Sequence, residues 1–174
     1  KNFKKEIHRV SMLSLSNAFT EEDLNNFEKK MMNYLDKKDN FQIEYSVEPK
    51  IDGISASLTY KKGKLITGLS RGDGQEGEDI TANLKTIEDI PKAVVDKDFP
   101  LDIDIRGEVF IQNSDFRKIK GKFANPRNAA SGSLRQKNPE DTKKIPLRFI
   151  AYTFGYEKGL KVDNQTDYLV KLKE

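Results

Sequence analysis

Two short strand-like stretches joined by a four-residue turn constrain the fold more than any other feature of this sequence. Ile54–Tyr60 and Leu65–Leu69 have the length and residue content of β-strands, and Lys61–Lys64, with its glycine, joins them. Strands joined by so short a turn are antiparallel, because a parallel connection needs a dozen or more residues. The sequence therefore predicts an antiparallel hairpin.

Further strands and helices are predicted on both sides of this hairpin. Apolar residues alternate at positions 41, 43, 45 and 47 and predict a strand, and further strands are predicted over 101–111 and 147–154. Helices are predicted over 21–36, 79–86, 114–120, 125–136 and 165–174. This combination predicts an α+β fold with antiparallel sheets and flanking helices.

The length of 174 residues corresponds to a single domain. We interpret residues 1–19 as an N-terminal arm and residues 20–174 as the domain itself. The formal net charge of +3 is too small for a polybasic protein that binds nucleic acid through charge alone. No apolar run is long enough to span a membrane, and we expect no membrane partner.

Cysteine is absent, and His8 is the single histidine. This composition excludes disulfide bonds, cysteine nucleophiles, thiolate zinc sites and metal sites built from several histidines. We interpret His8 as a solvated residue of the arm.

A lysine between two carboxylates precedes the hairpin. Glu48, Lys50 and Asp52 share one face of an extended segment, and the following Gly53 allows a close approach of backbone or ligand. The lysine is either part of a structural ion pair or a nucleophile. A free lysine is protonated at neutral pH, so a nucleophilic Lys50 requires desolvation or nearby cations and predicts arginines close to it.

A glycine-rich loop follows the hairpin over residues 71–77. Its glycines match the pattern G-x-G-x-x-G, and Asp96 lies about twenty residues further on, as in dinucleotide-binding proteins. That fingerprint needs a parallel βαβ unit, whereas the strand before this loop belongs to a hairpin. The other interpretations are an Arg-Gly-Asp adhesion triplet, a solvated loop, and a loop that brings Arg71 to a phosphate.

The second half of the chain contains two further candidates. Glu108 follows a glycine within an apolar strand and is either an edge-strand charge or a carboxylate that binds sugar hydroxyls. Arg127 and Arg135 lie on a predicted helix of small residues, and both can reach one surface. That surface suits a phosphate, unless the helix is simply a packed internal one. We expect Tyr152 to pack against its neighbours.

These motifs, in this order, resemble the adenylation domain of bacterial NAD⁺-dependent DNA ligases. The resemblance extends from residue 7 to residue 156. The stretches SRGDGQEGEDITAN and FANPRNAASGSLRQ are its most specific parts, whereas the motif K-x-D-G at Lys50 would also suit ATP-dependent ligases and capping enzymes. The other matching segments are residues 12–19, 48–53 and 106–110.

The resemblance implies a nucleotidyltransferase (ATP-grasp-like) fold and a reaction in three steps. A lysine takes adenylate from NAD⁺ and releases nicotinamide mononucleotide, the adenylate passes to the 5′-phosphate of a DNA nick, and the 3′-hydroxyl displaces AMP. Mg²⁺ is implied mainly as a ligand of the phosphates. The implied partner is nicked double-stranded DNA, and the implied protein is a cytoplasmic monomer that acts in DNA replication and repair.

Roles for the charged residues around the reacting phosphate follow from their matched positions. Lys50 is the implied nucleophile, and Asp52 is implied to orient it or to assist the metal. Arg71 matches the arginine near the adenylate and the nick. Arg127 and Arg135 match contacts to nucleotide or DNA phosphates.

The resemblance also implies the residues that hold the nucleoside of the adenylate. Ser14, Leu15 and Glu48 match contacts on the adenine side. Glu108 matches the ribose contact.

The sequence departs from the family in what it lacks. Two later lysine motifs, one of the form D-G-x-V-x-K, do not occur, and neither does the small domain that recognises nicotinamide mononucleotide. We therefore expect an adenylation domain truncated at its C-terminus, and we expect this chain alone not to seal nicks. The alternatives are a non-catalytic module that binds adenylate or DNA, and an ATP-dependent nucleotidyltransferase.

Overall fold

A computed structural model describes residues 3–37, 41–119 and 121–173. The chain forms two compact units, and each is described by itself. Unit 1 comprises Lys1–Met12 and Pro49–Glu174, and unit 2 comprises Leu13–Glu48. The division into an arm of residues 1–19 and a domain of residues 20–174 stays a prediction.

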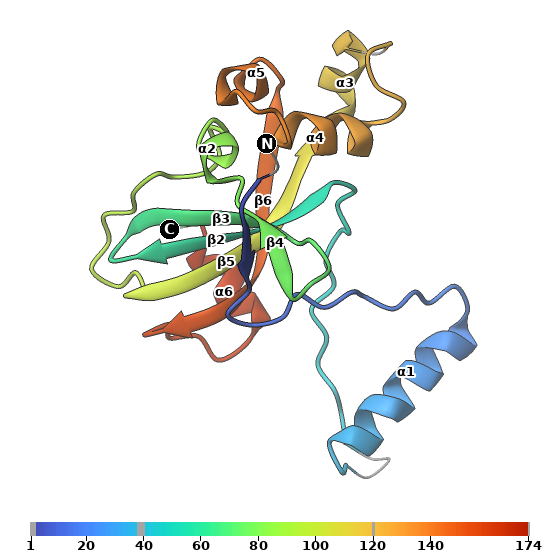
Figure 1. Cartoon of the computed structure of the whole chain (residues 1–174). Helices are drawn as coiled ribbons and strands as arrows, with labels where there is room; N and C mark the ends of the chain where they lie inside the picture. Colours follow the sequence, from blue (N-terminus) through green and yellow to red (C-terminus); the bar gives the residue numbers. More distant parts are fainter. Residues whose placement is uncertain (1–2, 38–40, 120, 174) are drawn as a thin grey trace. The chain divides into compact units, whose positions relative to one another are not determined.

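Unit 1 is built on a four-stranded antiparallel sheet with the order β3-β2-β5-β6 (Figure 1). Its strands are β2 (Ile54–Lys61), β3 (Lys64–Ser70), β5 (Asp102–Ile111) and β6 (Leu147–Lys158). The predicted hairpin is confirmed, since β2 pairs with β3, and Lys62 and Gly63 between them have positive φ angles of 50° and 74°. β5 has a neighbour on each side and is an inner strand.

One face of this sheet carries the hydrophobic core. Alternate residues of β2 and β5 share this face and are buried: Ala56, Leu58, Tyr60, Ile103, Ile105 and Val109. The buried apolar residues of α2 (Thr81–Leu84) and α4 (Pro126–Leu134) belong to the same cluster. Figure 1 shows these two helices grouped with α5 (Pro139–Lys143) beside the sheet. Alanines in α4 allow the helix to approach β5 closely.

The opposite face of β2 and β5 is polar. Three residues of β2 lie directly opposite three residues of β5: Ser55 opposite Glu108, Ser57 opposite Arg106, and Thr59 opposite Asp104. All three charged residues of this set are buried. Buried polar groups need hydrogen-bond partners, and the register supplies them for Glu108 and Asp104, as where Thr59 Oγ1 donates to Asp104 Oδ1 at 2.6 Å. Arg106 instead donates to the carbonyl oxygens of Val10 and Ser11.

A second, two-stranded sheet joins the N-terminal residues to the glycine-rich loop. β1 (Lys5–Ile7) pairs antiparallel with β4 (Glu76–Glu78). The sequence predicts neither strand, because three residues are too few to show an alternating pattern. Residues 5–7 are thereby fixed to unit 1.

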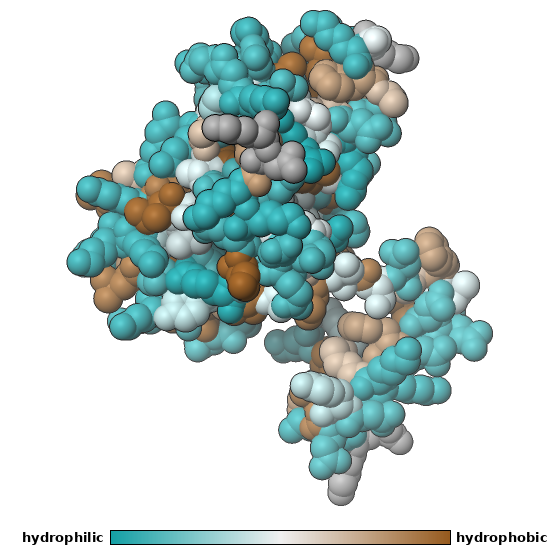
Figure 2. Space-filling model, viewed as in Figure 1, coloured by the Kyte–Doolittle hydropathy of each residue, from teal (hydrophilic) through white to brown (hydrophobic). Residues whose placement is uncertain are grey.

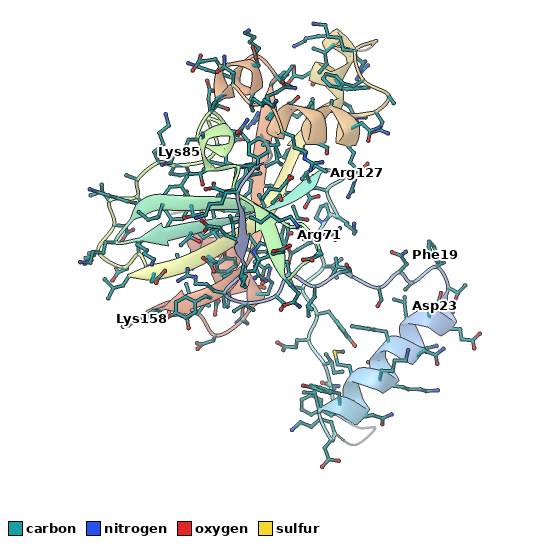
Figure 3. The ribbon with its side chains drawn as sticks, viewed as in Figure 1. Phe19, Asp23, Arg71, Lys85, Arg127 and Lys158 are labelled. Atoms are coloured by element: carbon teal, nitrogen blue, oxygen red, sulfur yellow. The ribbon has the colours of Figure 1, made fainter. Side chains whose placement is uncertain are left out.

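Unit 2 contains the helix α1 (Glu21–Tyr34), which confirms the helix predicted over 21–36 with a shorter end. Thr20 Oγ1 accepts a hydrogen bond from Asp23 N at 3.1 Å, and Asp23 Oδ2 accepts one from Thr20 N at 3.0 Å. This reciprocal pair is a capping box that starts the helix. Figure 3 shows Asp23 at this end, close to Phe19.

The strand predicted over residues 41–47 is wrong. These residues belong to no helix or strand, and Val47 is 92% exposed. Alternation of apolar residues produces a strand only where a neighbouring strand can satisfy the backbone hydrogen bonds. The four apolar positions therefore have no buried face to occupy.

The other predicted helices are confirmed with shifted ends, and α5 is an addition. α3 spans Asn113–Ile119 and α6 spans Gln165–Lys171. The architecture is α+β with antiparallel sheets, as predicted. Hydrophilic residues cover most of the visible surface in Figure 2, in line with a charged content of 34%. No helix of the described residues has the length and apolar character needed to cross a membrane.

Candidate functional site

Glu108 is the centre of the candidate site. It lies on β5 and is only 8% exposed. Ser55 Oγ on β2 donates a hydrogen bond of 2.9 Å to Glu108 Oε2. The interpretation of Glu108 as an edge-strand charge is wrong, because β5 is an inner strand. A carboxylate in this position is fixed in direction by the sheet.

Two donors and two cations act on the Glu108 carboxylate. Burial raises the pKa of Glu108 and is the largest effect. Hydrogen bonds from the Ser55 hydroxyl and the Gly53 amide lower this pKa, and so do the positive charges of Arg127 and Lys50. Lys50 and Arg127 therefore lie near enough to Glu108 to influence its ionisation.

The turn before β2 brings these groups together. A Cβ at Gly53 would lie 2.2 Å from Val109 O and 2.9 Å from Glu108 Cγ, so only glycine allows this approach to β5. On the neighbouring residue, Asp52 Oδ1 accepts a hydrogen bond of 3.0 Å from Arg127 Nη1. Both side chains of this ion pair are substantially exposed. The structure thus places Lys50, Asp52, Glu108 and Arg127 in one site.

Tyr152 and Arg71 extend the site. The pKa of Tyr152 is raised, first by burial and also by the charge of Glu108, while a hydrogen bond with Ser55 and the charge of Arg71 lower it. Tyr152 therefore lies close enough to Glu108 for the two groups to influence each other's ionisation. Figure 3 shows Arg71 beside β4 and Arg127 at the start of α4, so the two arginines come from different elements.

The glycine-rich loop has a different architecture from a dinucleotide-binding turn. It leads from β3, which is antiparallel to β2, into β4, so no parallel βαβ unit forms around it. Gly72 has a φ of +57°, and a Cβ there would lie 1.9 Å from Glu76 O. The dinucleotide interpretation is therefore wrong for this loop, whose glycines serve a tight turn into β4.

Arg127 and Arg135 are held at opposite ends of α4. Asn125 caps the start of this helix, with Oδ1 accepting from Asn128 N at 2.7 Å. Arg135 Nη2 at the other end donates to Glu78 Oε1 at 2.7 Å, whereas Arg127 bonds Asp52. A cavity of ≈ 320 Å³ lies beside Arg135, with Ser70, Gly72, Glu78 and Ser131 in its lining.

The three residues expected on the adenine side lie in unit 2. They are Ser14, Leu15 and Glu48. Within this unit, Ser46 Oγ donates to Glu48 Oε1 at 3.1 Å. Their contacts with adenine stay predictions.

Sequence reasoning misjudged His8 and missed Ser55. His8 is not solvated: it is 8% exposed, and its Nε2 lies 3.1 Å from the carbonyl oxygen of Arg71. The cause is the pairing of β1 with β4, which brings the arm onto the loop. Ser55 becomes recognisable once the β2–β5 register is known, because only that register sets it opposite Glu108.

Tyr152 packs as predicted, but it also joins the site. It lies where the pairing of β5 with β6 shifts register, between Thr153, opposite Arg106, and Ala151, opposite Gly107. Such an irregularity re-aims a side chain, and an alternating pattern does not reveal it. No group of three or more His, Cys, Asp or Glu side chains among the described residues is placed to hold a metal ion.

Comparison with known proteins agrees with these features. The whole chain, residues 1–174, matches the family described as NAD-dependent DNA ligase adenylation domain. A DNA ligase of Pelagibacter ubique is 69% identical over 99% of this chain and 26% of its own length. DNA ligases of Parvibaculum lavamentivorans and Rickettsia bellii are 47% and 46% identical over 94% and 99% of this chain, and over 24% and 26% of their own lengths.

The chain spans about a quarter of the length of the curated relatives that it matches. The match to the family, in contrast, extends over every residue of this chain. On this evidence, the chain belongs to the family of NAD-dependent DNA ligase adenylation domains.

Proposed function

We propose that this chain carries the centre at which NAD⁺ is cleaved and a lysine is adenylated, with Lys50 as the acceptor. One observation carries the proposal: Gly53, three residues after Lys50, packs against Glu108 on β5, and the neighbouring Asp52 accepts a hydrogen bond from Arg127. Membership of an NAD-dependent family supplies the donor. A nucleophile, phosphate-binding cations and a sugar-binding carboxylate are thus available in one site.

The proposed step is a displacement at phosphorus. Lys50 loses a proton to solvent or to a neighbouring carboxylate, and the Nζ lone pair attacks the α-phosphorus of NAD⁺. An N–P bond forms, the P–O bond to nicotinamide mononucleotide breaks, and that leaving group takes the electron pair. Arg71 and Arg127 stabilise the negative charge on the phosphoryl oxygens, because guanidinium groups bind them through charge-assisted hydrogen bonds.

The two carboxylates of the site have separate proposed roles. Glu108 accepts hydrogen bonds from the ribose hydroxyls, since Ser55 and Gly53 already fix its orientation. Asp52 orients Lys50 or assists a metal, and its ion pair with Arg127 links the lysine motif to α4.

The remaining predicted contacts belong to the nucleoside and to DNA. Ser14, Leu15 and Glu48 are proposed to contact the adenine, and Arg135, with Arg127, the phosphates of the nucleotide or of DNA. Arg135 supports this role by standing beside a cavity at the end of α4. Its side chain is largely exposed, whereas that of its ion-pair partner Glu78 is partly buried.

We propose that Mg²⁺ enters this site with the phosphates of the substrate. The described residues do not form a side-chain cage of three or more metal ligands. No step above depends on a metal held by the protein. The ion would neutralise phosphate charge as the substrate binds.

The later steps concern a whole ligase, and this chain spans about a quarter of the length of such relatives. We infer that the adenylate passes to the 5′-phosphate of nicked double-stranded DNA and that the nick is then sealed, in replication and repair. The relatives are named DNA ligases, which supports this inference. Action as a cytoplasmic monomer stays a prediction.

A comparison of donors tests the proposal against its two alternatives. The chain is incubated with NAD⁺ or with ATP, and intact mass and released nicotinamide mononucleotide are measured together. We expect one covalent adenylyl group per chain with NAD⁺, an equal amount of released mononucleotide, and no adduct with ATP. Adduct formation from ATP would identify an ATP-dependent nucleotidyltransferase, and nucleotide binding without any adduct would identify a non-catalytic module.

A further inference from the structure

The N-terminal segment, residues 4–12, lies along the glycine-rich loop and is bonded to it repeatedly. Besides the pairing of β1 with β4, the backbone N–H of His8 donates to Gln75 O at 2.8 Å, and that of Met12 donates to Gly74 O at 2.9 Å. Arg71 belongs to this loop. The segment therefore supports the loop over residues 74–78, from Gly74 to the end of β4.

The ring of His8 extends this support to Arg71 itself. Its Nε2 lies 3.1 Å from the carbonyl oxygen of Arg71, and the residue is buried. A carbonyl oxygen only accepts hydrogen bonds, so Nε2 must carry the proton in this contact. The ring also rests on Gly77, where a Cβ would lie 3.0 Å from Nε2. His8 thus contacts both ends of the loop.

The N-terminal segment is anchored to the sheet independently of the loop. Arg9 Nε donates to Asp104 Oδ2 at 3.0 Å, and the buried Arg106 donates from Nη1 to Ser11 O at 3.1 Å. Asp104 and Arg106 both belong to the inner strand β5. His8 is therefore followed directly by residues that are bonded to the sheet, and the residues before it are held by the pairing of β1 with β4.

We propose that His8 is a positioning residue for Arg71: its Nε2–H holds the Arg71 carbonyl and fixes the point at which the loop leaves β3. Because the backbone of Arg71 is then held in one position, its guanidinium reaches the site from a fixed point. The proposal deepens the proposed function and rests on it only for the effect on adenylation. The hydrogen bond and the order of the loop are independent of that function.

The protonation state of the ring provides the first test. Because His8 is the single histidine, its ring nitrogens give an unambiguous pair of signals in a ¹⁵N-edited NMR spectrum. We expect the neutral ring to carry its proton on Nε2. A neutral ring with its proton on Nδ1 would overturn the proposal, since Nε2 would then be an acceptor facing a carbonyl oxygen.

Two variants of similar side-chain length separate hydrogen bonding from packing. His8→Gln keeps an N–H donor at a similar reach, and His8→Met removes it. Amide hydrogen exchange is measured for residues 72–78 and, as an internal reference, for β2 and β5. We expect exchange in the loop to accelerate in His8→Met and to remain near the unsubstituted rate in His8→Gln, with no change in the reference strands.

Equal acceleration in both variants, or none in His8→Met, would overturn the proposal. If His8→Met does not fold, the ring tautomer and His8→Gln still decide the question. At saturating NAD⁺, we expect the adenylation rate to fall about 5- to 10-fold in His8→Met and to recover in His8→Gln. If the unsubstituted chain forms no adduct, the proposed function fails. The role of His8 in holding the loop is still tested by the ring tautomer and by amide hydrogen exchange, because neither measurement depends on adenylation.

Discussion

Asn83 donates from Nδ2 to Thr142 Oγ1 at 2.7 Å and joins α2 to α5 inside the protein. The same nitrogen donates to Gln136 O at 2.8 Å, and Thr142 Oγ1 donates to Ser133 O at 2.7 Å. Asn83 ends one of the two family-specific stretches, and Gln136 ends the other. A buried polar network therefore connects α2, which follows the loop that carries Arg71, to α5 and to the C-terminal end of α4.

Replacement of Asn83 by alanine is expected to destabilise the fold by about 2 kcal/mol, because the backbone carbonyl of Gln136 and the hydroxyl of Thr142 lose a buried donor. Urea unfolding of the variant measures this loss. Asn25→Ala serves as the control, since Asn25 is exposed on α1 and alanine is the better helix former. Equal midpoints for Asn83→Ala and the unsubstituted chain would show that the network contributes nothing to stability.

Gly53 is expected to tolerate no side chain. A Cβ there would collide with Val109 O at 2.2 Å, so Gly53→Ala displaces the turn that carries Lys50 and Asp52 away from β5. We expect a lower melting temperature and loss of adenylation.

Gly132→Ala is the matched control for this substitution. The Cβ of that variant would lie 3.6 Å from Phe123, an ordinary contact, and alanine favours the helix α4. The melting temperature of this control is expected to stay equal or to rise. A Gly53→Ala protein as stable and active as the unsubstituted chain would refute the close approach of the turn to β5.

The raised pKa of Glu108 predicts a pH dependence of stability. Burial raises this pKa above its unfolded value of 4.5, so the folded state binds the proton more strongly than the unfolded state. The resulting stabilisation is fully present below the unfolded pKa and is lost as the pH rises through the folded pKa. Glu108→Gln removes this loss because glutamine does not ionise.

Melting temperatures of Glu108→Gln and the unsubstituted chain, measured from pH 4 to pH 8, test this prediction. The variant is expected to gain stability relative to the unsubstituted chain as the pH rises. Ser55 Oγ can still donate to the glutamine oxygen, so the native hydrogen bond is retained. A variant that becomes relatively less stable with rising pH would mean that Lys50 and Arg127 outweigh the burial of the carboxylate.

The sequence was sufficient for the elements whose signal is local. The β2–β3 hairpin follows from its turn, α1 from the cap at Thr20, and α4 from Asn125 and Pro126. The sequence also marks four residues of the site. Lys50 and Asp52 belong to the motif K-x-D-G, Glu108 is a charge within an apolar strand, and Arg127 lies in a segment of small residues.

Features that depend on pairing between distant segments were not predictable in this way. The false strand at 41–47 has the right alternation and no partner, while β1 and β4 have a partner and no alternation. Burial of His8 and the role of Ser55 follow from strand register. Register is a property of two segments together, so neither stretch of sequence shows it alone.

The most direct test of the account locates the adenylyl group. Three proteins are incubated with NAD⁺ and Mg²⁺ and analysed by intact mass and peptide mapping: the unsubstituted chain, Lys50→Ala and Lys161→Ala. Lys161→Ala is the control, because it changes an exposed lysine. The account predicts one adenylyl group on the peptide that contains Lys50, the same adduct in Lys161→Ala, and none in Lys50→Ala. An adduct on another residue, an adduct that persists in Lys50→Ala, or no adduct in the unsubstituted chain would contradict the assignment of Lys50 as the acceptor in this chain.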